Sequence, residues 1–269
     1  MSVTITAADI NKLRQSTGAG MLDCRKALTE SNGDFEAAID WLRKQGQKVA
    51  AKRSDREAKE GVIIAQTTAD HKSGIVLCIS CETDFVSKNA DFVAFAQSIA
   101  DAAIANNVKS AEELNGVAVN GSTVEELIND KLASIGEKIA VSKFERVDAP
   151  YVASYIHGAN RMGVLVSMTK EAADAGKDVA MQIAAMNPLA VDETSISQET
   201  KDREKAIAIE MIKAEGKPAE MAEKIADGKM NKFFKDNTLM AQAFVKDNSK
   251  SVADYLKSVD ADLKVTDFK

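Results

Sequence analysis

The feature that most constrains the fold is an apolar pattern that occurs twice along the chain. In its first copy, β-branched runs at 62–65 and 74–79 flank a turn-forming segment, and apolar residues at helical spacing follow from Phe92 to Ala103. This order predicts a β-hairpin followed by a helix, and residues 124–135 predict a second helix. The same order recurs between residues 152 and 186. A unit that occurs twice predicts a duplicated core of antiparallel sheets and helices, which is an α+β fold.

Short helices are predicted before this core. Thr6 is a suitable N-cap with Asp9 as its capping-box partner, and the pair Asn32-Gly33 is suited to end the second helix. Asp34 is expected to cap the third helix and Gly46 to end it. The pattern predicts a compact three-helix bundle of the ubiquitin-associated (UBA-like) type.

A charged segment with helical periodicity follows the second copy. Residues 197–235 predict an antiparallel helical hairpin, because Glu215-Gly216-Lys217-Pro218 breaks the pattern in its middle. Leu263 to Phe268 alternates like a strand. The predicted domains are a UBA-like domain at 1–55, a core N-subdomain at 56–148 and a core C-subdomain at 149–269, which contains the hairpin.

The charge balance bears on the class of partner. The net charge is −6 and only 5% of the residues are aromatic, whereas nucleic-acid binders usually carry a basic face. The basic stretch from Arg43 to Lys59 is interpreted as a solvated helix or linker. Because no run approaches the ~20 apolar residues of a membrane span and the start lacks a signal-peptide pattern, we expect a cytoplasmic protein without direct nucleic-acid or membrane binding.

Two groups of residues are candidates for catalysis. Cys78-Ile79-Ser80-Cys81 has the spacing of a redox pair or of half a zinc site. On a strand, however, residues i and i+3 face opposite ways, so structural thiols are favoured and a thiol oxidoreductase is the alternative. His71 and His157 fall in or beside hairpin turns without a recognisable catalytic partner. The sequence therefore predicts no catalytic residue, metal site or cofactor.

A segment between the first hairpin and its helix is the strongest candidate for partner binding. In Thr83 to Asn89, Phe85 and Val86 precede the apolar face of the helix, and Ser87 or Asn89 is expected to cap it. An apolar side chain in a loop beside an acid is a candidate anchor for a partner. The alternative is a hydrophobic staple, in which Phe85 or Val86 packs on its own helix.

Several motifs carry a resemblance to a known family. The run from Leu13 to Leu28, which contains Thr17-Gly18-Ala19-Gly20-Met21-Leu22-Asp23, and the run Thr83-Asp84-Phe85-Val86-Ser87-Lys88-Asn89 resemble two signatures of the bacterial elongation factor Ts family. Shorter matches are Ile135-Gly136-Glu137, His157-Gly158, Gly163-Val164-Leu165-Val166, Ile183-Ala184-Ala185 and Gly228-Lys229-Met230. Matches in the same order along almost the whole chain are more specific than any single motif.

The resemblance implies a non-catalytic guanine-nucleotide exchange factor for elongation factor Tu, a GTPase. It implies that Thr83, Asp84, Phe85 and Val86 form the edge that displaces elements around the phosphates and magnesium, with Asp84 and Phe85 wedged between helices of the GTPase. It places Arg14, Met21 and Leu22 on an N-terminal contact and His157 on a second-core contact. In some members the helical hairpin mediates self-association.

The chain departs from the family pattern at a few positions. Gln182 stands where the family often has His, and Leu22 stands where it often has Met, so the contact chemistry is expected to change there. Members usually continue past the position of Lys269 with another strand and a terminal helix. A further alternative function is a passive adaptor, in which residues 1–55 alone bind the partner.

Overall fold

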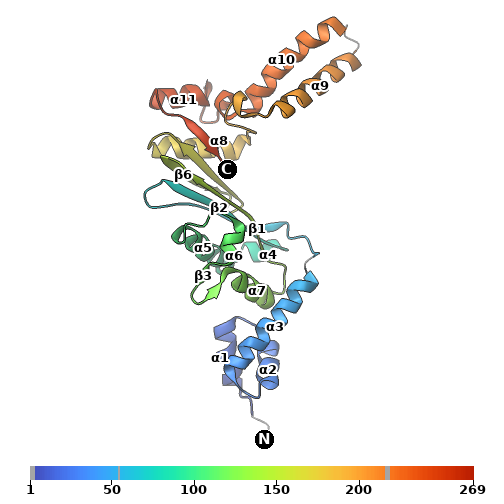
Figure 1. Ribbon diagram of the computed structural model, residues 1–269, viewed down its shortest axis with the longest axis vertical. Coiled ribbons are helices and arrows are strands. Elements are labelled where there is room, and N and C mark those ends of the chain that lie inside the picture. Colours follow the sequence, from blue (N-terminus) through green and yellow to red (C-terminus); the bar gives the residue numbers. More distant parts are fainter. Residues whose placement is uncertain (1–3, 54, 216–218) are drawn as a thin grey trace. The chain divides into compact units, whose positions relative to one another are not determined.

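The computed structural model of the protein contains both helices and antiparallel sheets (Figure 1). It describes residues 4–53, 55–215 and 219–269. The predicted α+β class is confirmed. The chain divides into two compact units, one of Met1–Ile64 with Ile75–Arg146 and one of Ala65–Gly74 with Val147–Lys269. The finer division into domains at 1–55, 56–148 and 149–269 stays a prediction.

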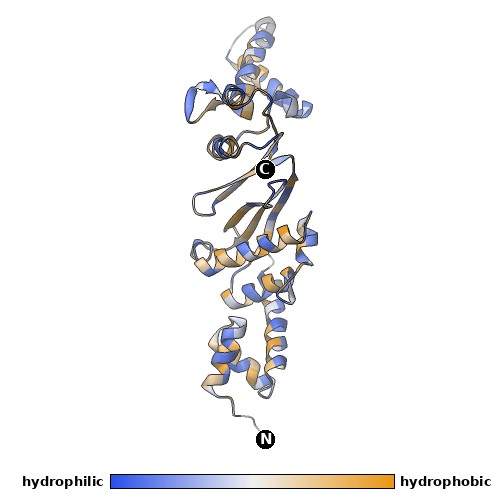
Figure 2. Cartoon of the chain, turned by 90° about the vertical axis from the view of Figure 1, so that its left-hand side faces the viewer, coloured by the Kyte–Doolittle hydropathy of each residue, from blue (hydrophilic) through white to orange (hydrophobic). Residues whose placement is uncertain are grey.

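The N-terminal helices are α1 (Ala7–Thr17), α2 (Met21–Glu30) and α3 (Phe35–Arg53). Thr6 and Asp9 form the predicted capping box, and Gly18 ends α1 with a left-handed φ of 69°. In Figure 2 the helices nearest the N label carry both orange and blue segments, as amphipathic helices do. They enclose a small core of Leu13, Ala19, Cys24, Ala27, Leu28 and Ala38.

The expected end of the third helix at Gly46 is wrong, because α3 continues to Arg53. The reason is a close approach within the first unit. A Cβ built on Gly46 would lie 3.0 Å from the Cβ of Ala133 in α7 (Val124–Ile135). Glycine is therefore used here to let two helices approach, and the helix continues through it.

The first unit contains a sheet in the order β1-β2-β5, so the return strand β2 is central. Its core includes Ile75, Leu77 and Ile79 of β2 and Phe92 and Ile99 of α5. The predicted helix at 124–135 is confirmed as α7. The other bounds are β1 (Glu60–Thr67), β2 (Ser73–Cys81), α4 (Asp84–Ser87), α5 (Ala90–Ala105), α6 (Ala111–Asn115), β3 (Ala118–Val119), β4 (Ser122–Thr123) and β5 (Ala140–Asp148).

The second unit repeats this arrangement with a sheet in the order β10-β7-β6. The return strand β7 is again central, and it pairs antiparallel with β6 in a register from Tyr151↔Met168 to His157↔Met162. The predicted strand near the C-terminus is confirmed as β10, which pairs antiparallel with β7. The bounds are β6 (Tyr151–His157), β7 (Met162–Met168), α8 (Ala173–Met186), β8 (Ala243–Phe244), β9 (Asp247–Ser251), α11 (Val252–Val259) and β10 (Val265–Phe268).

A pair of helices, α9 (Gln198–Ala214) and α10 (Ala219–Asn237), forms the predicted helical hairpin (Figure 1). They meet through Ala208, Ile212 and Ala226. The predicted turn residues Gly216-Lys217-Pro218 lie outside the described residues. Among the helices that the structure describes, none has both the length and the apolar character that crossing a membrane requires.

Candidate functional site

The segment that follows β2 forms one turn of helix, α4, where the sequence had suggested a loop. Thr83 precedes it with extended backbone, and the N–H of Lys88 donates to the carbonyl of Asp84 at 3.0 Å. A four-residue helix is too short to show a 3.6-residue period, which is why the pattern did not indicate it. The turn holds the backbone of Phe85 in a defined conformation.

Phe85 and Val86 have different environments although they are neighbours. The side chain of Phe85 is 85% exposed, which is extreme for a large aromatic residue. Val86 is half-buried and packs against the core of the first unit, and Ser87 behind it is buried. Val86 therefore packs on the protein itself, whereas Phe85 does not. The alternative of a hydrophobic staple is wrong for Phe85.

The C-terminal end of this helical turn is fixed by Asn89. Its side-chain carbonyl accepts hydrogen bonds from the backbone N–H of Asp91 at 2.8 Å and of Phe92 at 3.3 Å. Asn89 is therefore the N-cap of α5, as one of the two predicted candidates. The turn is thus attached to a capped, core-packed helix.

Asp84 lies beside Phe85 and forms an ion pair with Lys88 at 2.6 Å. Both side chains are well exposed, at 44% for Asp84 and 69% for Lys88. Exposed pairs of this i,i+4 type contribute only about 0.3–0.5 kcal/mol. The ion pair with Lys88 therefore contributes only weakly to holding the carboxylate of Asp84.

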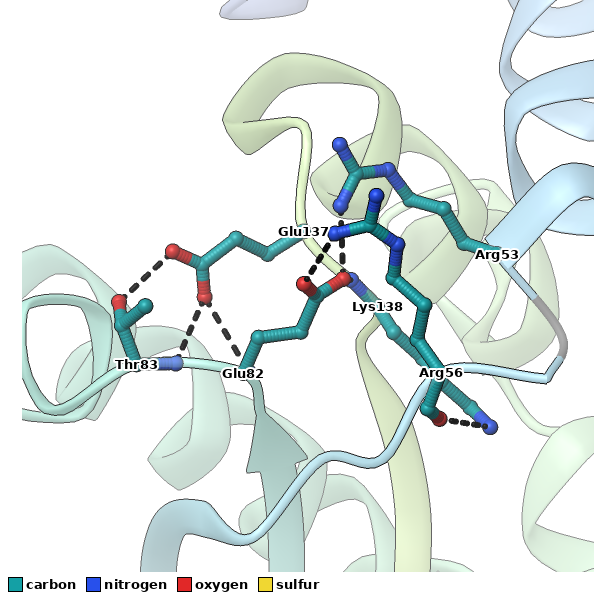
Figure 3. Close-up of polar contacts among 6 residues, drawn as sticks. All are labelled: Arg53, Arg56, Glu82, Thr83, Glu137 and Lys138. Carbon is teal, nitrogen blue, oxygen red and sulfur yellow. Dashed lines mark hydrogen bonds and ion pairs between the residues drawn. The ribbon is translucent and has the colours of Figure 1, made fainter.

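The N-terminal end of this helical turn is held by the carboxylate of Glu82 (Figure 3). Glu82 accepts from the backbone N–H of Lys138 at 2.6 Å, from Arg53 at 2.7 Å and from Arg56 at 3.2 Å. These contacts, led by the Lys138 N–H, hold the pKa of Glu82 below its ordinary value. The end of α3 and the start of β5 thereby meet at the residue before Thr83.

Thr83 itself is bound by Glu137 (Figure 3). One carboxylate oxygen accepts from the backbone N–H of Thr83 at 3.0 Å and of Glu82 at 3.1 Å, and the other accepts from the Thr83 hydroxyl at 2.7 Å. In the sequence, Glu137 is visible only as part of the motif Ile135-Gly136-Glu137, which does not assign it to the site.

The candidates on the N-terminal helices are exposed. Met21 and Leu22 begin α2 with exposed fractions of 54% and 82%, and Arg14 is exposed on α1. Apolar side chains left in solvent at the start of a helix are available to a partner. These residues, like Thr83 to Val86, belong to the first unit.

His157 belongs to the second unit, where it is the last residue of β6 and is exposed. Its Nδ1 lies 2.9 Å from the hydroxyl of Tyr155. Tyr155 was not among the predicted site residues, although alternation along a strand puts residues two apart on one face. The tyrosine fixes the orientation of the imidazole ring.

Gln182 does not lie on a contact surface, so the expected change in contact chemistry at this position is wrong. Its side chain is 0% exposed, and its oxygen accepts from the N–H of Val245 at 2.8 Å. An amide that forms hydrogen bonds inside the protein is a structural residue. The other departure, Leu22, is exposed and remains a contact candidate.

The surroundings of Cys81 and of His71 do not favour catalysis. Cys81 is buried, which raises the pKa of its thiol to about 11, so almost no nucleophilic thiolate exists at neutral pH. His71 lies exposed in the β1–β2 turn and stacks on Tyr151 with ring centroids 5.2 Å apart. Within the described residues, no group of His, Cys, Asp and Glu is arranged to hold a metal ion.

Known proteins are similar to this chain over nearly its whole length. Elongation factor Ts of Christiangramia forsetii is 50% identical over 268 residues, which is 98% of this chain and 97% of the relative. Elongation factor Ts of Flavobacterium psychrophilum is 49% identical over 99% of this chain and 97% of the relative. Elongation factor Ts of Clostridium perfringens is 42% identical over 98% of this chain and 91% of the relative.

A family model gives the same assignment. The model described as "Elongation factor TS" matches residues 82–269, a range that contains the turn from Thr83 to Val86 and His157. Identity of this level over nearly the whole chain, together with the ordered motifs, identifies the family. The chain belongs to the elongation factor Ts family.

Proposed function

We propose that this protein is a guanine-nucleotide exchange factor for elongation factor Tu, which it binds during translation elongation and from which it promotes the release of GDP. The observation that supports the proposal best is the placement of Phe85. In a chain of this family, a large aromatic side chain stands 85% exposed on a helical turn whose two ends are fixed by hydrogen bonds. Such an arrangement suits insertion into a partner.

The proposed mechanism is displacement. A bound guanine nucleotide is held largely through its phosphates and magnesium, so moving the helices around them weakens its binding. Phe85 inserts between helices of the GTPase, and burial of such a side chain contributes about 1.5–3 kcal/mol. Asp84 exchanges Lys88 for groups near the ion and disturbs their arrangement. The exchange factor and the nucleotide then weaken each other's binding reciprocally at equilibrium.

The remaining contacts are proposed to orient the wedge. Met21 and Leu22, with Arg14 on the neighbouring helix, would bind the GTPase at a second place, and His157 would contact another part of it. Each of these side chains is exposed. No step requires proton transfer or a covalent intermediate, so the protein acts without a catalytic residue or cofactor.

The self-association predicted for the helical hairpin remains a proposal of its own. Ile207 and Met211 are separated by one helical turn on α9, and their exposed fractions are 45% and 55%. Apolar side chains spaced i and i+4 form one stripe on a helix, which is the geometry that a second helix can cover.

The proposal is tested by the release of fluorescent GDP from purified elongation factor Tu. We expect the wild-type protein to accelerate release, and we expect Phe85→Ala to reduce the second-order rate constant about 10- to 150-fold, the factor that corresponds to the burial energy above. Release that stays at its spontaneous rate in excess wild-type protein would contradict the proposed function.

A matched control is Val259→Ala, which shortens an apolar side chain that is 49% exposed at the end of α11. This variant is expected to retain wild-type exchange. The same assay separates the alternatives. A passive adaptor that binds through residues 1–55 alone would bind elongation factor Tu without accelerating GDP release. A thiol oxidoreductase would lose its activity with Cys78→Ser and Cys81→Ser, whereas an exchange factor should keep its exchange rate.

A further inference from the structure

Two acidic side chains behind the exposed turn have no role in the partner contacts described above. We propose that Glu137 is a positioning residue for exchange, which together with Glu82 fixes the turn so that Phe85 is presented in the orientation needed for insertion. This inference rests on the proposed function. We call Glu82 and Glu137 the carboxylate latch.

The two residues join the same two segments of backbone in opposite directions. Glu137 accepts from the N–H of Glu82 and of Thr83, at 3.1 and 3.0 Å, while Glu82 accepts from the N–H of Lys138 at 2.6 Å. Each segment therefore supplies both a carboxylate and backbone donors (Figure 3). Hydrogen bonds to an ionised acceptor are stronger than neutral ones, and a reciprocal pair also restricts rotation of one segment about the other.

The positions of both carboxylates are themselves fixed. Glu137 follows Gly136, which ends α7 with a left-handed φ of 78° and so turns the chain towards Thr83. That conformation favours glycine, because a side chain there would be strained. Glu82 is held by Arg53 and Arg56, and its side chain is only 15% exposed. Neither acid is a freely rotating surface group.

The latch ends two residues before Phe85. The Thr83 hydroxyl adds a contact of 2.7 Å to Glu137, so both the backbone and the side chain of Thr83 are fixed where α4 begins. On the other side of Phe85, Val86 packs into the core and Asn89 caps α5. Phe85 is thus an exposed side chain on fixed backbone, and pre-organisation of this kind raises the fraction of molecules able to bind.

The first experiment compares Glu137→Ala with Glu137→Gln in the GDP-release assay. Alanine removes the carboxylate oxygens that accept these hydrogen bonds. If the fraction of molecules with a correctly placed turn then falls to about one tenth, the exchange rate constant falls about tenfold. Glutamine keeps an oxygen that can accept from both N–H groups, and its NH₂ can donate to the Thr83 hydroxyl. We therefore expect Glu137→Gln to stay within about threefold of wild type. An equal loss in both variants would show that the charge matters and not the placement, and would overturn the proposal.

The second experiment asks whether Glu137 acts through Phe85. In a double-mutant cycle, Glu137→Ala should cost about tenfold with Phe85 present and less than about twofold in the Phe85→Ala background, because the side chain to be positioned is absent. A full tenfold loss in both backgrounds would overturn the proposal. Glu145→Ala, which removes an exposed carboxylate of β5 in the same unit, is the matched control and should exchange like wild type.

A measurement on the wild-type protein covers the case in which Glu137→Ala does not fold. The N–H of Thr83 should be protected from hydrogen exchange, and Glu137→Gln should retain most of that protection. An unprotected Thr83 N–H in wild type would overturn the proposal. Failure of the proposed function would give a different result from failure of the positioning role. In that case the wild-type protein itself would leave the rate of GDP release unchanged.

Discussion

Gln182 has a fully buried side-chain amide that connects α8 to the segment after α10. Its Nε2 donates to the side-chain oxygen of Gln242 at 3.2 Å and to the carbonyl of Ala243 at 3.1 Å, and its oxygen accepts from the N–H of Val245 at 2.8 Å. Buried polar groups of this kind are costly when a partner is removed. The residue therefore stabilises the second unit.

Gln182→Leu tests this role, because it keeps the volume and removes both hydrogen-bonding groups. It leaves the Val245 N–H and the Ala243 carbonyl without this partner, so we expect the free energy of unfolding to fall by about 2–4 kcal/mol. Urea denaturation followed by circular dichroism measures it. Gln198→Leu, at an exposed position of α9, is the control and should change stability by less than about 0.5 kcal/mol. Equal stability of the two variants would contradict a structural role for Gln182.

At the residue scale, the sequence could identify Phe85 but not the groups that hold it. Phe85 lies before the periodic apolar face of α5, and this is visible from spacing alone. Glu137 contacts Thr83 across 54 positions of sequence, and no local pattern encodes such a contact. The burial of Gln182 was missed for the same reason, since it depends on residues about 60 positions away.

At Gly46, helix α3 approaches helix α7 closely. A Cβ on Gly46 would meet the Cβ of Ala133 at 3.0 Å and the carbonyl oxygen of Asn129 at 3.5 Å. Neither the β-carbon of Ala133 nor the carbonyl can rotate away. An added methyl group would therefore require a shift of one helix against the other.

Gly46→Ala and Gly228→Ala form a matched pair of helical glycine substitutions. Alanine gains about 1 kcal/mol of helix propensity at either position, but overpacking costs about 1–3 kcal/mol. At Gly228 in α10, no described atom lies within 4 Å of the added Cβ, so this variant should be more stable by about 1 kcal/mol. Gly46→Ala should be less stable than wild type, and chemical denaturation decides both signs. A stabilised Gly46→Ala would contradict the close helix contact.

At the element scale, long periodic segments were predictable and short ones were not. The helix at 124–135 and the strand near the C-terminus were identified correctly, because each carries an apolar pattern of its own period. The single turn α4 and the two-residue strands β3 and β4 were missed. Elements this short form through hydrogen bonds to their surroundings, and their own side chains show no period.

At the scale of the whole molecule, the two units use one topology. In each sheet the return strand of a hairpin is central, and a strand that comes later in the chain pairs on its other side. Strands β2 and β7 are the ones whose sequences align, at Gly74-Ile75-Val76-Leu77 and Gly163-Val164-Leu165-Val166. Both central strands are largely buried, and a strand buried on both faces requires a nearly continuous apolar run, which accounts for the similarity between the two copies.

The response of the whole chain to acid follows from its carboxylates. Many of them have a pKa below the ordinary value because nearby donors stabilise the ionised form, most often the hydroxyl of an N-cap or turn residue. They are Asp9, Asp70, Glu82, Asp192, Asp247, Asp254 and Asp260. Asp130 has the opposite shift, since burial raises its pKa.

A lowered pKa in the folded state means that the unfolded chain binds protons first as the pH falls. The stability that these groups contribute is therefore present above their ordinary pKa values of 3.8 for Asp and 4.5 for Glu, and it is lost as the pH falls through the lower folded values. Asp130 opposes this trend, but among the residues that the structure describes the carboxylates with a lowered pKa outnumber it. We expect the midpoint of urea unfolding to be nearly constant from pH 7 to about pH 5.5 and to fall steadily below about pH 4.5. Glu82→Gln should make this decline shallower if the latch contributes to it. A midpoint of wild-type unfolding that stays level or rises between pH 4.5 and pH 3 would show that these carboxylates do not stabilise the folded state.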